Sequence, residues 1–278
     1  MVLTKKGARG LAPNLALDLV REIIANRFKG KSIRVYEAGG GSLSILPLSL
    51  LNRPNISVVD IDETQLRNNQ YAQVKILGDI QTYSFPPDSF DLVVCNTVIE
   101  HLEHPDLAIK HFCDALTPGG ILFIGAPNPA SLSGFVTRYS PHWFHVWFYR
   151  VILQRKNAGQ PGQPPFPTIY NRIVHPTALI DFCENLDLKV IHFYELIGWS
   201  YFNIREKRPF FGRFLYAVVG MMNVFTLGRR DLRNGDYYVI FEKPASARGS
   251  VGCPAQSKSG NDMPFASIEP AKRPRPTS

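Results

Sequence analysis

The feature that most constrains the fold is a run of three glycines directly after a short apolar segment. Residues 33–38 (IRVYEA) form that segment, with Glu37 near its end, and Gly39, Gly40 and Gly41 follow. Because glycine has no Cβ, this loop can adopt positive φ angles and bring its backbone N–H groups close to a ligand. The pattern indicates a strand, a tight loop and a helix start. It predicts a nucleotide-type cofactor site at the carboxyl edge of a parallel sheet.

Further polar residues follow other apolar runs in the same order. Asp60 ends the run 56–60, at roughly the twenty-residue separation that places an acid beside a bound ribose. Asp79 comes after Gly78 and the run 73–77, and Asn96 ends residues 89–96, which are typical of a buried fourth strand. A fifth strand is expected just beyond the turn 117–120. The alternation of strands and helices predicts an α/β fold.

Together these segments resemble the class I S-adenosylmethionine-dependent methyltransferases, especially the broad small-molecule group. Its signature, acid-x-Gly-x-Gly, Phe-Asp-x-Val, Glu-His-x and Leu-x-Pro-Gly-Gly, is matched between about residues 30 and 128. The resemblance implies a doubly wound, mostly parallel seven-stranded sheet with an antiparallel last strand, a Rossmann-like methyltransferase fold with lid insertions. It also implies S-adenosyl-L-methionine as the cofactor.

The resemblance further implies which residues bind this cofactor. They follow the first four strands: Glu37, Gly39, Gly40, Gly41, Asp60, Ile61, Asp79, Ile80 and Asn96. The glycine loop would hold the methionine end, Asp60 the ribose hydroxyls, and Asp79 would approach the adenine amino group. Ile61 and Ile80 would form apolar walls of the adenine pocket. Asn96 would face the methionine portion or the substrate.

A nicotinamide-dinucleotide enzyme is the competing interpretation of the glycine loop. It fits less well, because the glycines are contiguous and Ser42, Leu43 and Ser44 follow, so that a full G-x-G-x-x-G is absent. Many methyltransferase relatives carry a third spaced glycine where this chain has Leu43. The loop is still expected to bind the cofactor.

His101 is the best candidate for a general base. An oxygen acceptor must lose its proton, and the ordinary pKa of histidine lies near neutrality. The alternative is that Glu100 and His101 close a helix turn and take no part in catalysis. This is the commoner role of the pair in the family that the chain resembles. Some relatives bind a divalent metal through Glu-x-x-Glu-His, but Thr97 replaces the first acid here. We therefore expect no metal requirement.

The chain divides into a core with additions at both ends. The expected parts are an N-terminal helical cap (1–30), a cofactor-binding core (31–128), a lid insertion (129–175), the C-terminal part of the fold (176–243) with an apolar insertion at 198–235, and a disordered tail (244–278). In the cap, Leu15, Leu19, Ile23 and Ile24 have helical spacing and are expected to face the sheet.

The segment 210–227 is strongly apolar and is bracketed by arginines. Gly220 and Asn223 interrupt it, and it is short for a membrane span. It either makes a peripheral contact with an anionic membrane surface or, as the commoner case, packs over the substrate pocket or a dimer interface. The net charge of +8 is concentrated around this insertion and at the two ends of the chain.

Composition sets the compartment and the class of partner. The four cysteines show no metal-ligand spacing, and the N-terminus lacks a secretory design, so we expect a cytoplasmic protein, either free or peripheral at a membrane surface. We expect methyl transfer to a small-molecule or lipid-like acceptor, most often at oxygen. The alternative is a catalytically inactive cofactor-binding protein that acts as a membrane-associated assembly partner. Nucleic acid is disfavoured as an acceptor because no Asn-Pro-Pro-aromatic sequence occurs.

Overall fold

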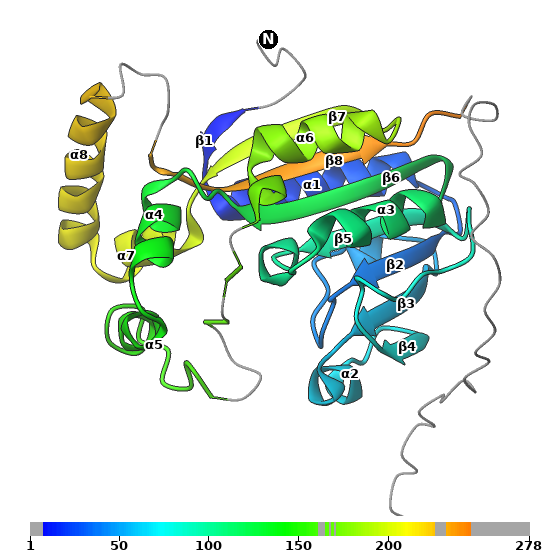
Figure 1. Cartoon of the computed structure of the whole chain (residues 1–278), viewed down its shortest axis with the longest axis horizontal. Helices are drawn as coiled ribbons and strands as arrows, with labels where there is room; N and C mark the ends of the chain where they lie inside the picture. Colours follow the sequence, from blue (N-terminus) through cyan, green and yellow to red (C-terminus); the bar gives the residue numbers. More distant parts are fainter. Residues whose placement is uncertain (1–7, 161–164, 167, 170, 226–231, 246–278) are drawn as a thin grey trace, which may run out of the picture.

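A twisted eight-stranded sheet forms the centre of the protein (Figure 1). The structure is a computed structural model that describes residues 8–160, 165–166, 168–169, 171–225 and 232–245. The strands are β1 (Arg9–Leu11), β2 (Arg34–Ala38), β3 (Asn55–Asp60), β4 (Val74–Leu77), β5 (Phe90–Asn96), β6 (Leu116–Pro127), β7 (Lys189–Ile197) and β8 (Asn234–Glu242). Their order across the sheet is β1-β7-β8-β6-β5-β2-β3-β4.

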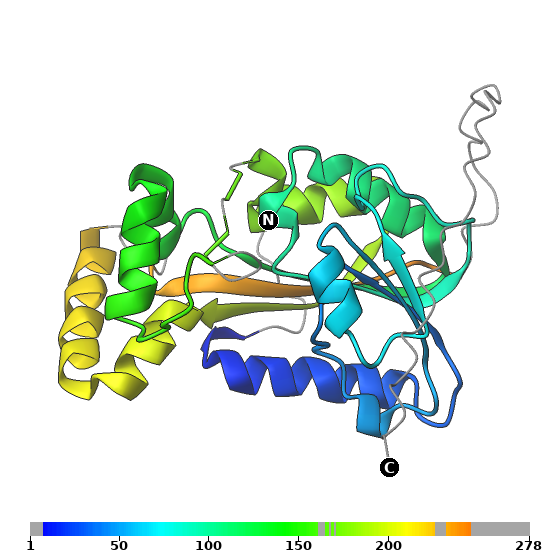
Figure 2. The same cartoon turned by 90° about the horizontal axis from the view of Figure 1, so that it is seen from below.

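Helices connect and cover these strands. They are α1 (Pro13–Arg27), α2 (Glu63–Asn68), α3 (Pro105–Ala115), α4 (Leu132–Tyr139), α5 (His142–Val151), α6 (Pro176–Asn185), α7 (Trp199–Lys207) and α8 (Pro209–Phe225), with 3-10 turns η1 (Leu48–Leu50), η2 (Ile99–His101) and η3 (Arg172–Val174). Figure 2 shows α1 on one face of the sheet and α3 and α6 on the other. The sheet is thus covered on both faces, as a parallel sheet requires.

The strand directions confirm the doubly wound α/β fold. Strands β4, β3, β2, β5 and β6 pair in parallel, whereas β8 is antiparallel to both β6 and β7. All carboxyl ends of the parallel strands therefore meet at one edge of the sheet, where ligands of such folds bind. We call this edge the carboxyl edge.

The N-terminal segment differs from the expected helical cap. Residues 9–11 form an additional edge strand, β1, which pairs in parallel with β7. The guanidinium Nε of Arg9 lies 2.8 Å from Oε2 of Glu195 on β7 and helps to hold this short strand. The sheet consequently has eight strands rather than the expected seven.

Helix α1 presents a different stripe to the sheet from the expected one. Ala16, Val20 and Ile24 are buried, whereas Leu15 is about half exposed. Ile24 was expected on this face and lies there, but the stripe continues through smaller residues at four-residue spacing. Leu19 and Ile23 lie beside this stripe and are partly buried against the same core. The expectation for Leu15 was wrong because the most buried line of the helix runs one position further along the chain, where the same four-residue period also holds.

The turn expected at 117–120 belongs to strand β6. The register between β5 and β6 shifts between Phe90 and Leu92, which leaves extra residues on β6. Gly119 takes a φ of +80°, and its N–H donates to the carbonyl of Lys243 at 2.7 Å. Pairing with the extended residue Lys243 keeps these residues in the sheet, so the apparent turn is a β-bulge.

Helices α4, α5, α7 and α8 gather at one end of the sheet in both views (Figures 1 and 2). Helices α4 and α5 follow β6, and α7 and α8 are inserted between β7 and β8. No helix in the described ranges is long and apolar enough to cross a membrane. The last two residues of the expected apolar segment 210–227 lie outside the described residues. Residues 246–278 of the expected tail 244–278 lie outside them as well.

Candidate functional site

The glycine loop leaves β2 at the carboxyl edge with the predicted backbone conformation. Gly39 and Gly41 have φ angles of +64° and +54°. The N–H of Gly39 donates to the carbonyl of Val59 at 2.8 Å, which ties the loop to β3. A Cβ on Gly39 would lie 2.7 Å from both methyl carbons of Val98. Only glycine combines this φ with so close an approach.

Asp60, at the end of β3, organises the loop and the turn beyond it. Its Oδ2 accepts from the N–H of Gly41 at 2.9 Å, and its Oδ1 accepts from the N–H of Asp62 at 2.8 Å. Each carboxylate oxygen can accept a second hydrogen bond. Asp60 can therefore hold the loop and still bind vicinal hydroxyls of a ribose.

Three polar side chains that sequence patterns did not reveal hold the other side of the loop. Asn69 donates to the carbonyl of Gly41 at 2.7 Å, and the hydroxyl of Tyr71 donates to the carbonyl of Gly40 at 3.2 Å. Gln65 accepts from the hydroxyl of Ser42 at 2.8 Å. The one local signal in this region is Asp62, which caps α2 by accepting from Gln65 N–H.

Glu37 lies buried beneath the loop. Its Oε1 accepts from the hydroxyl of Ser44, while its Oε2 is buried and has no hydrogen-bond partner in the described part of the chain. Burial raises the pKa of this carboxyl above its ordinary value. A Cβ on Gly40 would lie 3.2 Å from Oε2 of Glu37, so this oxygen faces the loop directly.

Asp79 lies in the loop after β4. Its carboxylate accepts from the backbone N–H and the side-chain amide of Gln81, whose own oxygen accepts from the N–H of His104 at 2.7 Å. This links the loop after β4 to the start of α3. Of the two expected adenine walls, Ile80 is buried and Ile61 is 75% exposed. Their assignment to adenine stays a prediction.

Asn96 ends β5 with its side chain against β6. Its Oδ1 is buried and has no hydrogen-bond partner among the described residues. A Cβ on Gly125 would lie 2.2 Å from this oxygen, so only glycine on β6 leaves room for it. The next residue, Thr97, has a φ of +55°, a conformation that costs a β-branched residue energy and marks a sharp exit from the strand.

Glu100 and His101 lie on η2, one short turn beyond Asn96. The N–H of His101 donates to the carbonyl of Val98, whose side chain packs over Gly39, so Val98 links His101 to the glycine loop. The nearest approach between His101 Nε2 and Glu100 Oε1 is 3.8 Å. Glu100 is buried, and its burial raises its pKa to about 8. Its Oε2 has no hydrogen-bond partner in the described ranges.

Residues of the expected lid also contact η2. The ring of Phe166 lies edge-on to His101 with 5.9 Å between ring centroids. The N–H of Ile169 donates to the carbonyl of Glu100 at 2.8 Å. These contacts place the expected lid insertion against the candidate base.

Strand β8 adds two groups that sequence patterns did not indicate. Asp236 accepts from the N–H of Trp199 at 2.8 Å, and burial raises its pKa to about 6. Its negative charge also contributes to the raised pKa of Glu100. The neighbouring Tyr237 is buried and donates its hydroxyl to the carbonyl of Val174 at 2.6 Å.

The donor set at the carboxyl edge fits S-adenosylmethionine. Glu37, Asn96 and Glu100, which have buried oxygens without a partner among the described residues, belong to segments that end at or follow this edge, where the glycine loop and Asp60 also lie. Acidic oxygens also suit a cationic sulfonium and the hydroxyls of a ribose. Within the described residues no group of histidine, cysteine and acidic side chains could hold a metal ion. Whether the reaction needs a metal stays a prediction.

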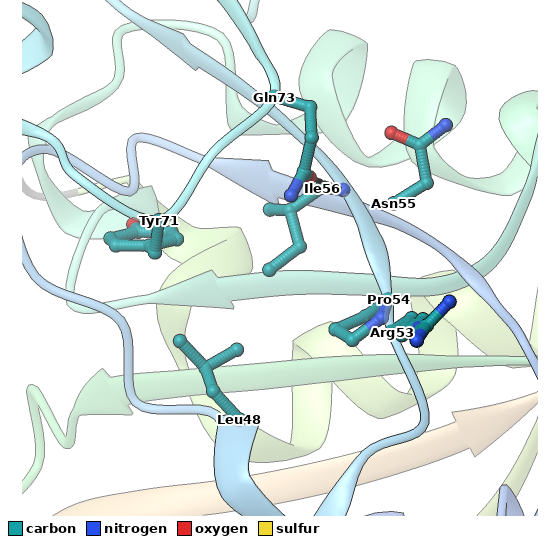
Figure 3. A pocket seen from close by; sticks show the side chains of 7 residues that line it. All are labelled: Leu48, Arg53, Pro54, Asn55, Ile56, Tyr71 and Gln73. Carbon is teal, nitrogen blue, oxygen red and sulfur yellow. Dashed lines mark hydrogen bonds between the residues drawn. The ribbon is translucent and has the colours of Figure 1, made fainter.

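The cavity shown in Figure 3 lies elsewhere. It has a volume of about 440 Å³ and lies at the start of β3, the edge opposite the glycine loop. Its lining consists of Leu48, Arg53, Pro54, Asn55, Ile56, Tyr71 and Gln73. Because it lies at the opposite edge, this cavity is separate from the carboxyl-edge site. Tyr71 belongs to both, since its hydroxyl donates to the carbonyl of Gly40 in the loop.

The chain is similar in sequence to known methyltransferases. Residues 9–192 match a protein family described as a methyltransferase domain. A malonyl-[acyl-carrier protein] O-methyltransferase from Paenibacillus sp. (strain JDR-2) is 30% identical over 129 residues, which cover 41% of this chain and 47% of that protein. A ubiquinone biosynthesis O-methyltransferase from Coxiella burnetii (strain Dugway 5J108-111) is 23% identical over 182 residues, covering 60% and 70%.

The chain spans about half the length of the first of these relatives. Among solved structures, the [4+2]-cyclase SpnF superposes with a TM-score of 0.52 at 15% identity, over 84% of each chain. At this identity the likeness shows the fold alone. A cyclase with the same fold means that the fold does not by itself assign methyl transfer.

Proposed function

Because this chain belongs to the methyltransferase domain family, of the class I S-adenosylmethionine-dependent kind, we propose that it methylates an oxygen of a small, lipid-like acceptor. The observation that carries this proposal is the position of His101. Its backbone joins the turn that touches the glycine loop, its ring contacts the lid, and its imidazole lies beside the buried carboxyl of Glu100. This position supports a role for His101 as the base between the cofactor loop and the acceptor.

Oxygen is the proposed acceptor atom for two reasons. A hydroxyl acceptor must lose a proton, and an imidazole can take it near neutral pH. Two relatives with about a quarter to a third identity are O-methyltransferases, one for malonyl-[acyl-carrier protein] and one in ubiquinone biosynthesis. A carboxylate acceptor would be ready to react without the base, and a phenol or alcohol would use it.

Each residue of the site would have its own role in methyl transfer. The bound cofactor supplies a methyl group made electrophilic by its sulfonium. His101 would take the proton that a hydroxyl acceptor loses as its oxygen bonds to the methyl carbon and S-adenosylhomocysteine leaves. Oε1 of Glu100 lies 3.8 Å from Nε2 of His101 and would help to hold the imidazole in place. Gly39, Asp60 and Asn96 would align the cofactor.

A lipid-like acceptor is proposed because an aromatic side chain of the lid lies at His101 and is not itself covered. Phe166 is half exposed although it contacts the His101 ring. An apolar acceptor body would cover such a surface, and its burial would exclude water from the transferred methyl group.

We also propose that the protein acts in the reducing cytoplasm. Cys95, Cys113 and Cys183 are free and buried, and burial raises the pKa of each thiol. Such thiols are unreactive core residues and need no oxidising environment. Cys253 lies outside the described residues.

Two measurements test the enzyme. Calorimetric titration with S-adenosylmethionine, S-adenosylhomocysteine and NADH, without added metal, should give binding of the first two in the micromolar range, about 8 kcal/mol of binding free energy. Methyl transfer is then measured with radiolabelled cofactor on a panel of amphiphilic phenols, alcohols and carboxylates. Labelled product that is hydrolysed by base identifies a methyl ester, and the NMR shift of the transferred methyl group distinguishes an O-methyl ether from methylation at carbon.

The variant His101→Gln separates catalysis from binding. It should keep cofactor affinity, lower kcat on a hydroxyl acceptor by about 10²- to 10⁴-fold and abolish the acidic limb of the pH–rate profile. Cofactor binding with no product from any acceptor would instead support a catalytically inactive protein with an assembly role. Binding of NADH alone would overturn the proposal.

A further inference from the structure

Helix α8 leaves one apolar face uncovered. Phe210, Phe214, Ala217 and Met221 are all exposed and have the spacing of a single helical face. Phe210 is 85% exposed and Phe214 is 65% exposed. Burying such a face is favourable because it removes apolar surface from water. We call these four residues the α8 stripe.

The inner face of α8 is already occupied by the protein. Val219 and Gly212 are buried, and a Cβ on Gly212 would lie 2.6 Å from Cα of Arg205 on α7. The ring of Tyr216 contacts Tyr201 of α7 and the guanidinium of Arg233. The opposite face of α8 is therefore already packed against the protein. The α8 stripe faces outward because of this packing.

Two neighbouring helices show the same pattern. Trp143 and Trp147 of α5 are exposed at four-residue spacing, and so are Phe135 and Tyr139 of α4. None of the residues of α5 is buried. Figures 1 and 2 place α4, α5 and α8 at the same end of the sheet. Exposed aromatics on three helices at one end exceed what isolated surface residues explain.

The charge of this end points to the partner. The exposed charged residues of α4, α5, α7 and the α7–α8 junction are mostly basic: Arg138, Arg150, Arg205, Lys207, Arg208 and, on α8, Arg213. Glu206 is the single acid in the sequences of these four helices. A second copy of this chain would bring like charges together, whereas an anionic surface is attracted to them.

We propose that α4, α5 and α8 form a docking surface for an anionic phospholipid membrane. The α8 stripe and the exposed tryptophans would enter the headgroup region, and the surrounding arginines would contact lipid phosphates. This docking surface follows strands β6, β7 and β8, which end or begin at the carboxyl edge. Docking would present that edge to the membrane. The proposal rests on α4, α5 and α8 and holds whether or not the acceptor is a lipid.

Vesicle flotation of the purified full chain tests the docking. The protein should float with vesicles of phosphatidylcholine containing about one quarter phosphatidylglycerol and stay at the bottom with pure phosphatidylcholine. Each basic residue that reaches the surface should raise the partition coefficient on the order of fivefold. Raising the salt from about 0.1 M to about 0.5 M should release the protein.

Matched variants locate the contact. The pair Phe210→Ser and Phe214→Ser should lower partitioning at least about tenfold, because two large apolar groups no longer enter the headgroup region. The control pair Leu50→Ser and Val74→Ser removes exposed apolar residues from η1 and β4, and it should float as the wild type does. Leu50 is 64% exposed, close to the value for Phe214. Both pairs should keep wild-type melting temperature and S-adenosylhomocysteine affinity.

Three outcomes would overturn the proposal. One is equal flotation with neutral and anionic vesicles, and another is wild-type flotation by the Phe210→Ser, Phe214→Ser variant. The third has two parts: the wild type sediments as a dimer and floats with neither kind of vesicle, and the variant sediments as a monomer. That last result would assign the face to a second copy of this chain. Failure of flotation alongside normal methyl transfer would leave the proposed function intact.

Discussion

The backbone N–H of Gly41 donates a hydrogen bond of 2.9 Å to Oδ2 of Asp60, which joins the loop after β2 to the end of β3. The carboxylate expected to bind a ribose is thus the same group that fixes the glycine loop. Loop order and cofactor affinity are therefore coupled through one side chain. Any change at Asp60 acts on both.

Asp60→Asn should weaken S-adenosylhomocysteine binding by about ten- to a hundredfold, since hydrogen bonds to a charged group contribute about 1.5–3 kcal/mol. Calorimetric titration measures the affinity, and circular dichroism shows whether the fold is retained. Asp62→Asn is the control, because asparagine caps α2 as well as aspartate does. Wild-type affinity in Asp60→Asn would remove the ribose assignment.

Gly39→Ala should lose cofactor binding, because the new Cβ meets the Val98 methyl carbons at 2.7 Å and the φ of +64° is strained for alanine. Gly30→Ala isolates the strain: Gly30 has a φ of +73° and open space at its Cβ. It should cost about 1 kcal/mol of unfolding free energy and leave binding unchanged. Adding Val98→Ala to Gly39→Ala should recover part of the affinity, and no recovery would point to the backbone conformation alone.

Glu100→Gln should flatten the pH dependence of stability. The pKa of Glu100 is raised from 4.5 to about 8, so the native state keeps a proton that the unfolded chain has lost. Stability of the wild type should therefore fall as pH rises from about 4.5 to about 8, by at most about 5 kcal/mol from this group. Urea unfolding of the cofactor-free protein at several pH values measures the slope.

In that series, glutamine mimics the protonated carboxyl and should match the wild type at pH 5 and exceed it at pH 8. Asp236, whose pKa is raised to about 6, should supply part of the remaining slope, which Asp236→Asn would remove. Equal slopes in the wild type and Glu100→Gln would mean that Glu100 is ionised and solvated in the native state.

Tyr237→Phe should lower the unfolding free energy by about 1–2 kcal/mol, because the buried carbonyl of Val174 loses its 2.6 Å hydrogen bond. Tyr36→Phe provides the matched comparison. The Tyr36 hydroxyl is buried and has no hydrogen-bond partner in the described part of the chain. Removing it should be neutral or stabilising. Denaturant titration of both variants tests the pair, and a larger loss in Tyr36→Phe would contradict it.

The sequence predicted the parts of the site that local rules determine. A strand followed by glycines predicted positive φ angles, which Gly39 and Gly41 have. Asp60 ends β3 at the same edge of the sheet, and its expected contact with a ribose stays a prediction. The antiparallel last strand was also correctly expected. These features depend on backbone sterics and on the common edge of parallel strands, so short motifs are sufficient to predict them.

The features that sequence analysis missed depend on contacts between distant segments. Asn69 and Tyr71 hold the glycine loop from about thirty residues away, and nothing in their local pattern marks them. Strand β1 exists because residues 9–11 pair with β7, far along the chain. Asp236 was likewise read only as the start of a strand. Such contacts become visible only when the sheet is assembled.

The insertion that carries α7 and α8 leaves the sheet at Gly198 and returns at Gly235. A Cβ on Gly235 would lie 2.6 Å from Cα of Gly198, so the two ends of the insertion touch. Strands β7 and β8 are antiparallel neighbours at this point and could be joined by a tight turn. The insertion therefore joins the sheet at a single point, where its two ends are in contact. Because its two ends meet between strands that are already paired, the length of the insertion can change during evolution without moving β3, which carries Asp60, or η2, which carries His101.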